Sequence, residues 1–262
     1  MTKSQFLLQI FLYYFLLTAV VYFISDFVIF PNFQSSYDDK TFKPAIIKLT
    51  TDDNKKISAV YLPHPNARFT VLISHGNAED LGNISFMIKD FFDHGFSVFA
   101  YDYHGYGTSE GRPSEKNTYL DIEAAFHYLV TTLRIPPNHI ILYGRSLGSG
   151  PTLELARQTK VAGIILESAF TTAFRVMTVL PLFPVDKYRN LQKIEGIETP
   201  ILFIHGTKDT VIPLWHSEKL YEKAPPKKSF LRVLGAGHND VMEKGYKQYW
   251  QAIQEFVLSL ND

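Results

Sequence analysis

One serine in this 262-residue chain stands between two glycines, directly after an apolar run. The segment Gly144–Gly148 reads GRSLG and fits the pattern G-x-S-x-G, in which a sharp turn joins a strand to a helix. Such a turn would push the Ser146 hydroxyl into a cleft, while the glycines let other chain segments pass close by. Ser146 is therefore predicted to act as a nucleophile, if a base and an acid can reach it.

Two other residues fit these roles, because each stands shortly after an apolar run. Asp209 follows the run Ile201–Ile204, and His238 follows the run Phe230–Leu234. The chain order serine, aspartate, histidine is the order used by hydrolases with a G-x-S-x-G turn, whereas two other kinds of serine hydrolase use different orders. We predict that His238 takes the proton from Ser146 and that Asp209 orients the imidazole ring.

Backbone N–H groups should bind the oxyanion that forms during attack by the serine. One donor is expected directly after the nucleophile, at Leu147, and the other in the loop after the run Thr70–Ser74. That loop reads Ser74-His75-Gly76-Asn77-Ala78, and the N–H of Asn77 is predicted to be the second donor.

Three polar residues near these positions have alternative interpretations. Glu167 ends a different apolar run and remains an alternative for the acid of the triad. His75 precedes the oxyanion loop and is expected to make structural hydrogen bonds. Asp240 is expected to cap the last helix.

These residues can meet only if their strands end on the same side of one sheet. The middle apolar runs carry almost no polar residues, which is typical of strands buried on both faces. The first two runs should form a hairpin through Thr51–Lys55, and the later alternation with helices predicts a mostly parallel sheet of α/β class. The predicted strands are Ala45–Leu49, Ile57–Leu62, Thr70–Ser74, Ser97–Tyr101, Ile140–Tyr143, Val161–Leu166, Ile201–Ile204 and Phe230–Leu234. The predicted helices are Asp80–His94, Glu115–Leu133, Leu147–Thr159, Leu214–Lys223 and Val241–Leu260.

The first 30 residues have a different composition from the rest. The stretch Phe6–Ile24 has no charged residue, and as a helix it would be about 28 Å long, close to the thickness of a bilayer core. We predict a single-pass membrane anchor over residues 1–30 and a catalytic domain over residues 31–262. A cleaved signal peptide is the main alternative, although Lys3 is its only cation and no small-residue cleavage site follows. A buried core helix would usually show a polar stripe. Lysines flank the stretch on both sides, so the membrane side stays open.

Composition excludes several other classes of function. The 26 Lys and Arg residues balance the 26 Asp and Glu residues, which argues against a partner bound through its phosphates, such as nucleic acid. The chain has no cysteine, which rules out thiol chemistry and cysteine-based metal sites. The histidines form no H-E-x-x-H pattern, and Gly105, Gly107 and Gly111 do not have dinucleotide-binding spacing. Neither a metal nor an organic cofactor is expected.

About 30 residues separate Glu167 from Thr199, so any cap over the site must be small. Its apolar residues either pack as an ordinary helix and turn, or form an acyl pocket or a surface that rests on the bilayer. These residues are Phe170, Phe174, Met177, Val179, Leu180, Leu182 and Phe183.

Five segments together resemble the α/β-hydrolase superfamily, and within it the Bem46-type family related to the α/β-hydrolase-domain protein depalmitoylases. They are Ser74–Gly82 (SHGNAEDLG), Tyr101–Gly111 (YDYHGYGTSEG), Tyr143–Gly150 (YGRSLGSG), Ile204–Val211 (IHGTKDTV) and Gly235–Val241 (GAGHNDV). The resemblance implies an α/β-hydrolase fold with helices on both faces of the sheet, the triad Ser146, Asp209 and His238, and catalysis without a cofactor. The chain departs from those depalmitoylases in one respect. It has no cysteine-rich, lipidated N-terminus and carries a hydrophobic stretch there instead.

The expected function is that of a membrane-anchored serine hydrolase. It would cleave ester or thioester bonds through an acyl-enzyme, with a lipid or an acylated protein as substrate. Two alternatives remain open: a catalytically weak hydrolase-fold scaffold at the membrane, and a carboxylesterase of small soluble esters.

Overall fold

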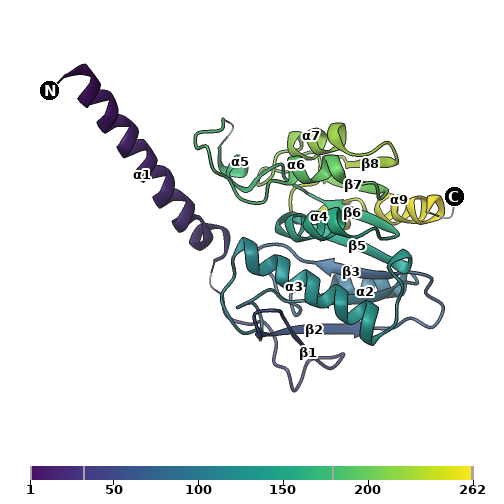
Figure 1. Ribbon diagram of the computed structural model, residues 1–262. Coiled ribbons are helices and arrows are strands. Elements are labelled where there is room, and N and C mark those ends of the chain that lie inside the picture. The colour runs from purple at the N-terminus through teal and green to yellow at the C-terminus, as the bar shows by residue number, and fades with distance from the viewer. Residues whose placement is uncertain (1, 32, 179, 261–262) are drawn as a thin grey trace.

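The computed structural model describes residues 2–31, 33–178 and 180–260, and its centre is an eight-stranded sheet. The strands lie in the order β1-β2-β4-β3-β5-β6-β7-β8 (Figure 1). Strands β3 to β8 run parallel, whereas β2 is antiparallel to both of its neighbours. All eight predicted strands are present, and the mostly parallel α/β sheet is confirmed. The strands are β1 Ile47–Thr50, β2 Lys56–Leu62, β3 Thr70–Ser74, β4 Ser97–Tyr101, β5 Ile140–Arg145, β6 Gly163–Glu167, β7 Ile201–Gly206 and β8 Lys228–Val233.

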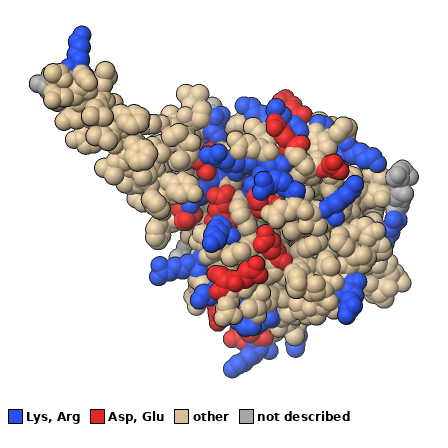
Figure 2. Space-filling model, viewed as in Figure 1, with Lys and Arg blue, Asp and Glu red and all other residues tan. Residues whose placement is uncertain are grey.

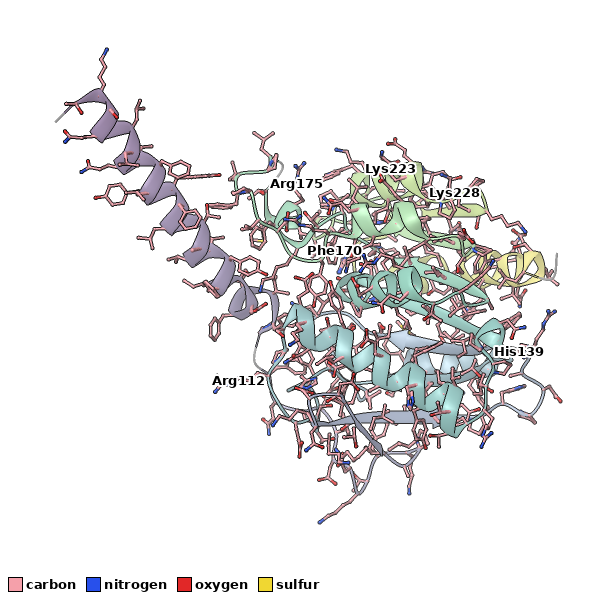
Figure 3. The ribbon with its side chains drawn as sticks, in the orientation of Figure 1. Arg112, His139, Phe170, Arg175, Lys223 and Lys228 are labelled. Atoms are coloured by element: carbon pink, nitrogen blue, oxygen red, sulfur yellow. The ribbon has the colours of Figure 1, made fainter. Side chains whose placement is uncertain are left out.

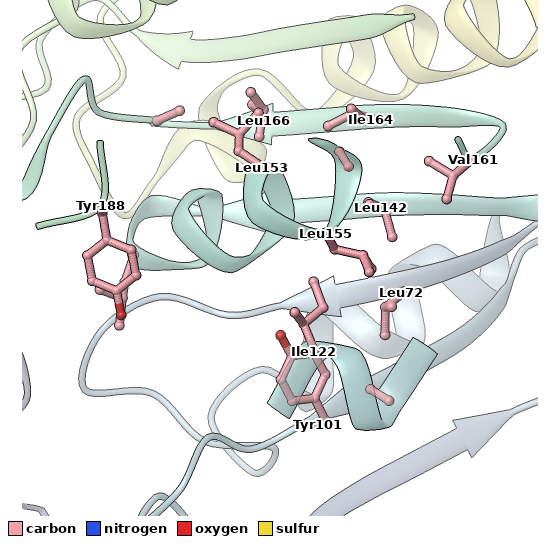
Figure 4. Packing of buried hydrophobic residues seen from close by; sticks show 14 of the residues in the cluster. Leu72, Tyr101, Ile122, Leu142, Leu153, Leu155, Val161, Ile164, Leu166 and Tyr188 are labelled. Atoms are coloured by element: carbon pink, nitrogen blue, oxygen red, sulfur yellow. The ribbon is translucent and has the colours of Figure 1, made fainter. Parts of the chain in front are cut away.

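Helices cover both faces of this sheet, as predicted. Successive residues of the central strands point to opposite faces, so Leu142 packs in one hydrophobic cluster and Ile141 in the other. The first cluster lies under α3, α4 and α7 (Figure 4), and the second under α2, α8 and α9. The helices are α1 Lys3–Ile29, α2 Ser85–Asp93, α3 Glu115–His127, α4 Ser149–Gln158, α5 Ala173–Met177, α6 Asn190–Lys193, α7 Trp215–Lys223, α8 Val241–Lys244 and α9 Tyr246–Ser259.

Several helix limits differ from the prediction. The helix predicted from residue 80 begins only at Ser85, because the side chains of Asp80 and Asn83 bind each other's backbone N–H groups and hold the chain in a turn. The helix predicted over residues 241–260 is broken at Gly245, where a Cβ atom would lie only 2.8 Å from Val233. The helix predicted over residues 115–133 ends as a π-helical turn, Tyr128–Thr132.

Helix α1 projects away from the sheet and its covering helices (Figure 1). It is long and apolar enough to cross a membrane, and only 6% of its most apolar 18-residue stretch is buried. Figure 2 shows this helix almost free of charged side chains, in contrast to the mixed charges of the domain beside it. Helix α1 is therefore not a core helix of the domain.

Candidate active site

Ser146 lies at the turn from β5 into α4, at the carboxyl end of the sheet. Its φ angle is 52°, in the left-handed region that residues other than glycine rarely adopt. The turn depends on Gly148, because a Cβ atom there would lie 2.0 Å from the carbonyl oxygen of Ser74. A short 3₁₀ helix, Ser146–Gly148, precedes α4, so the α-helix starts slightly later than predicted. The close chain approach predicted from the glycines is therefore present.

The structure brings Ser146, His238 and Asp209 together in one chain of hydrogen bonds. His238 Nε2 lies 3.0 Å from the Ser146 Oγ, and His238 Nδ1 lies 2.7 Å from Asp209 Oδ2. With the proton on Nδ1, the ring donates to Asp209 and its Nε2 accepts from the serine hydroxyl. This is the geometry that transfers a proton from a serine to a histidine during nucleophilic attack.

Asp209 is held as a carboxylate by its surroundings. Its Oδ1 accepts from the backbone N–H groups of Val211 and Ile212, at 2.9 and 2.8 Å. Burial by itself would raise the pKa of the Asp209 carboxyl, but hydrogen bonds from His205 and His238 and from the Ile212 N–H outweigh it and hold this pKa well below its usual range. Asp209 can therefore stabilise the positive charge that forms on His238 when it takes a proton.

The two predicted oxyanion donors lie beside this chain of hydrogen bonds. Asn77 and Leu147 both line the pocket that contains Ser146. Leu147 is the second residue of its short helix, and the first N–H groups of a helix have no partner within it. The side chain of Asn77 is held in the loop because its Oδ1 accepts from the Tyr106 hydroxyl at 2.8 Å. Both residues therefore border the pocket of Ser146, and their role as oxyanion donors stays a prediction.

A cluster of charged residues surrounds Arg145, the residue before the candidate nucleophile, and was not predicted from the sequence. Its guanidinium pairs with Glu79 and Glu167, and its Nη2 donates to the Asn239 side chain at 2.9 Å. Glu79 in turn accepts from the Gly76 N–H at 2.8 Å. Arg145 thereby connects the oxyanion loop to the loop that carries His238. An arginine inside an otherwise small-residue turn was the only sequence signal for this role.

Glu167 does not reach the candidate histidine. Its carboxylate accepts from the Tyr143 and Tyr249 hydroxyls at 2.7 and 2.8 Å and from Arg145 Nε at 3.2 Å. These three donors and the burial of the side chain leave Glu167 in a structural network, and the geometry does not support it as the acid of the triad.

For His75 and Asp240, the structure confirms the role predicted for the first and contradicts that predicted for the second. His75 is buried, its Nδ1 lies 2.8 Å from the Gly76 carbonyl oxygen and its Nε2 lies 3.3 Å from Asp102, in the kind of structural hydrogen bonding expected for it. Asp240 stands at the first position before α8, but its carboxylate accepts from the Gly237 N–H and pairs with Lys244. The prediction that its side chain caps the helix is therefore wrong, because the turn that carries His238 uses that carboxylate.

A pocket of about 350 Å³ opens over Ser146 and is lined in part by polar and in larger part by apolar residues. Phe170 and Met177 line it, and both lie in the segment between Glu167 and Thr199 that was predicted to form a small cap (the cap segment). Figure 3 shows Phe170 on the side of the domain that faces α1. Phe174 and Phe183 pack against each other instead, and Leu180 and Leu182 are exposed. Val179 lies outside the described residues. The remaining apolar lining residues are Val28, Ile29, Leu147, Ala173, Val176, Val211 and Ile212.

Among the residues that the structure describes, no group of three or more His, Asp or Glu side chains is placed to hold a metal ion.

Comparison with known proteins identifies relatives of this chain. The family model described as serine aminopeptidase, S33, matches residues 65–184. Human alpha/beta hydrolase domain-containing protein 17B is 41% identical over 211 residues, which cover 79% of this chain and 73% of the relative. Protein 17C of the same name from Xenopus tropicalis is 43% identical over 196 residues, 74% of this chain and 63% of that relative. The chain thus spans just under two thirds of the length of that relative.

Solved structures show the same fold at low sequence identity. An esterase of Pyrococcus furiosus superposes with a TM-score of 0.73 at 18% identity, over 88% of this chain and 98% of the esterase. A monoacylglycerol lipase of Paleococcus ferrophilus superposes with a TM-score of 0.62 at 21% identity, over 78% of this chain and 99% of the lipase. The chain has the α/β-hydrolase fold, and it belongs to the family of the alpha/beta hydrolase domain-containing proteins 17, in agreement with the family resemblance of its motifs.

Proposed function

We propose that this chain is a serine hydrolase that is anchored in a membrane by residues 1–30 and cleaves ester or thioester bonds of lipids or acylated proteins with its domain of residues 31–262. The observation that carries the proposal is the hydrogen-bond chain from Ser146 through His238 to Asp209, at 3.0 and 2.7 Å, inside a pocket with an apolar part. The apolar part suits a hydrocarbon chain, and the polar part suits the bond that is cleaved.

The proposed reaction has two steps. His238 Nε2 takes the proton of the Ser146 hydroxyl while Oγ attacks the substrate carbonyl carbon, and the N–H groups of Leu147 and Asn77 bind the oxyanion. The oxyanion collapses, the alcohol or thiol leaves with the proton from His238, and the acyl group stays on Ser146. Water then gives a proton to His238 and attacks the acyl-enzyme, and the free acid departs as Ser146 regains its proton.

Membrane anchoring is supported by the length, composition and exposure of α1. The apolar side chains of this helix project into solvent over nearly its whole length, which is unfavourable unless a bilayer surrounds them. Phe30, the residue directly after the helix, is buried in the hydrophobic core of the domain, so the helix and the domain are joined without a long linker.

Labelling with a fluorophosphonate probe of serine hydrolases tests this proposal. The wild-type chain should be labelled and the Ser146→Ala variant should lose labelling, because the Ser146 hydroxyl lies 3.0 Å from His238 Nε2, which can act as its base. Ser149→Ala is the matched control, since its hydroxyl is buried and donates to the Ser146 carbonyl oxygen at 2.7 Å. It should keep labelling.

Several results would contradict the catalytic or the membrane part of the proposal. Absence of labelling in the folded wild type would favour a catalytically weak scaffold. Rapid hydrolysis of short soluble esters with no activity on long acyl chains or acylated proteins would favour a carboxylesterase of small esters. The labelled band should also stay with membranes after alkaline extraction, and its mass should include residues 1–30. Release or a shorter mass would contradict the anchor and favour a cleaved signal peptide.

A further inference from the structure

The last turn of α1 forms part of the wall of the catalytic pocket. Val28 and Ile29 line the same pocket as Ser146 and His238. Ile29 is half-buried and packs against the hydrophobic cluster that underlies α3 and α4. The apolar helix therefore ends at the site of the chemistry and not at a distance from it.

This end of the helix is fixed to the domain by several contacts. Phe30 is buried, with its ring 6.4 Å from that of Tyr106 and 6.5 Å from that of Tyr188. In the last turns of α1, Asp26 forms an ion pair with Lys187, whose side chain is also buried. These contacts hold the pocket wall formed by α1 in one position relative to Ser146.

The other apolar wall of the pocket belongs to α5, which supplies Ala173, Val176 and Met177. The segment that begins there, residues 176–184, contains no charged residue. Within it Met177, Leu180 and Leu182 are 77%, 67% and 54% exposed. Three large apolar side chains so exposed beside a pocket mark a surface that meets an apolar environment.

A contact between the cap segment and α1 shows at which height along α1 these exposed apolar side chains lie. The Tyr14 hydroxyl donates to the carbonyl oxygen of Leu182 at 2.9 Å. Tyr14 lies about 18 Å along the helix axis from Asp26 and in the middle of the uncharged stretch Phe6–Ile24. If α1 spans a bilayer, the cap segment beside Tyr14 is at the depth of the lipid chains.

We propose that the acyl chain of the substrate lies between the last turn of α1 and α5, and that it enters this space directly from the bilayer. This inference rests on the proposed function and adds to it that Val28 and Ile29 of the anchor, with Val176 and Met177 of the cap, determine which acyl chains are accepted. A long chain then reaches Ser146 without leaving an apolar environment, because α1 and the cap segment border both the pocket and the lipid.

The test uses the full-length chain in phosphatidylcholine nanodiscs with p-nitrophenyl palmitate and p-nitrophenyl butyrate as substrates. Ile29→Trp places a bulky ring in the proposed channel and should lower the ratio of kcat/KM for palmitate over butyrate at least tenfold. Ile29→Ala widens the channel and should leave that ratio at or above the wild-type value. Ile24→Trp is the matched control on the same helix, at a side chain that is 51% exposed and lies outside the pocket, and should leave the ratio unchanged.

The failure of this inference is distinguishable from the failure of the proposed function. Fluorophosphonate labelling of each variant reports whether Ser146 is still competent. If labelled Ile29→Trp keeps the wild-type ratio, or loses activity on both esters equally, α1 does not select the acyl chain and the inference is wrong. If the wild type itself is not labelled, the proposed function is wrong.

Discussion

Asp209 and Glu167 stand at the carboxyl ends of neighbouring parallel strands, β7 and β6, yet they have opposite surroundings. Asp209 receives hydrogen bonds from the His238 ring and from two backbone N–H groups, and its Oδ2 also lies 3.3 Å from His205 Nε2. Glu167 receives hydrogen bonds from two tyrosine hydroxyls and an arginine. Both carboxylates are buried. Asp209 is linked to Ser146 through the His238 ring, whose Nδ1 faces Asp209 and whose Nε2 faces the serine hydroxyl. Glu167 has no such link.

Hydrogen-bond partners distinguish the carboxylate of the proposed triad from a buried carboxylate with a structural role. The strand end provides the position, but the partners decide the role. Loop residues after β7 leave one oxygen of Asp209 directed at His238, whereas Arg145 and the tyrosines occupy the oxygens of Glu167 and tie β5, β6 and α9 together. Removing charge should thus affect turnover at Asp209 and stability at Glu167.

The largest effect is expected for Asp209→Asn. The amide cannot hold the His238 ring in the tautomer that accepts the serine proton, so kcat should fall about 10³–10⁴-fold while the fold persists. Steady-state hydrolysis of a p-nitrophenyl ester measures this. Asp240→Asn, the same change two residues after His238, is the control and should lose far less. Retention of wild-type turnover by Asp209→Asn would remove Asp209 from the triad.

Glu167→Gln should mainly reduce stability. It leaves Arg145, itself buried, with Glu79 as its remaining carboxylate partner, and we expect a loss of about 2–4 kcal/mol in the free energy of unfolding. Turnover of the folded variant should stay within about tenfold of wild type, because the His238–Asp209 contact is untouched. Denaturant titration followed by the ester assay separates the two quantities. An inactive but equally stable Glu167→Gln variant would reverse the assignment of the two carboxylates.

The smallest effect concerns pH. Because the pKa of Asp209 is lower in the folded chain than in the unfolded one, its contribution to stability is present above the usual carboxyl pKa and is lost as the pH falls below about 4. The difference in unfolding free energy between wild type and Asp209→Asn should therefore shrink by about 1–2 kcal/mol between pH 5 and pH 2.5, allowing for partial solvent screening. Thermal unfolding over this range measures it. A pH-independent difference would show that the site does not favour the charged form of Asp209.

Much of the fold was predictable because strands buried on both faces leave a clear pattern. Thr70–Ser74 and Ser97–Tyr101 have the predicted limits, since turn residues flank uninterrupted apolar runs. Helix limits were less predictable, because they depend on tertiary contacts such as the crowding of Gly245 by Val233. Asn77, Ser146, Leu147, Asp209 and His238 could be selected in advance because each follows a strand of a parallel sheet.

The types and chain order of the candidate catalytic residues, the alternation that builds a parallel sheet and an uncharged stretch long enough to cross a membrane could all be predicted from the amino-acid sequence. The folded arrangement was needed to see which carboxylate faces His238, which ion pairs surround Arg145, and that Val28 and Ile29 of α1 reach the pocket of Ser146. The physical reason is that periodicity and turn chemistry act over neighbouring residues and are visible in the sequence. The pairing of buried charges and the closing of a pocket depend on side chains far apart in the chain, which meet only after the sheet and its helices have packed.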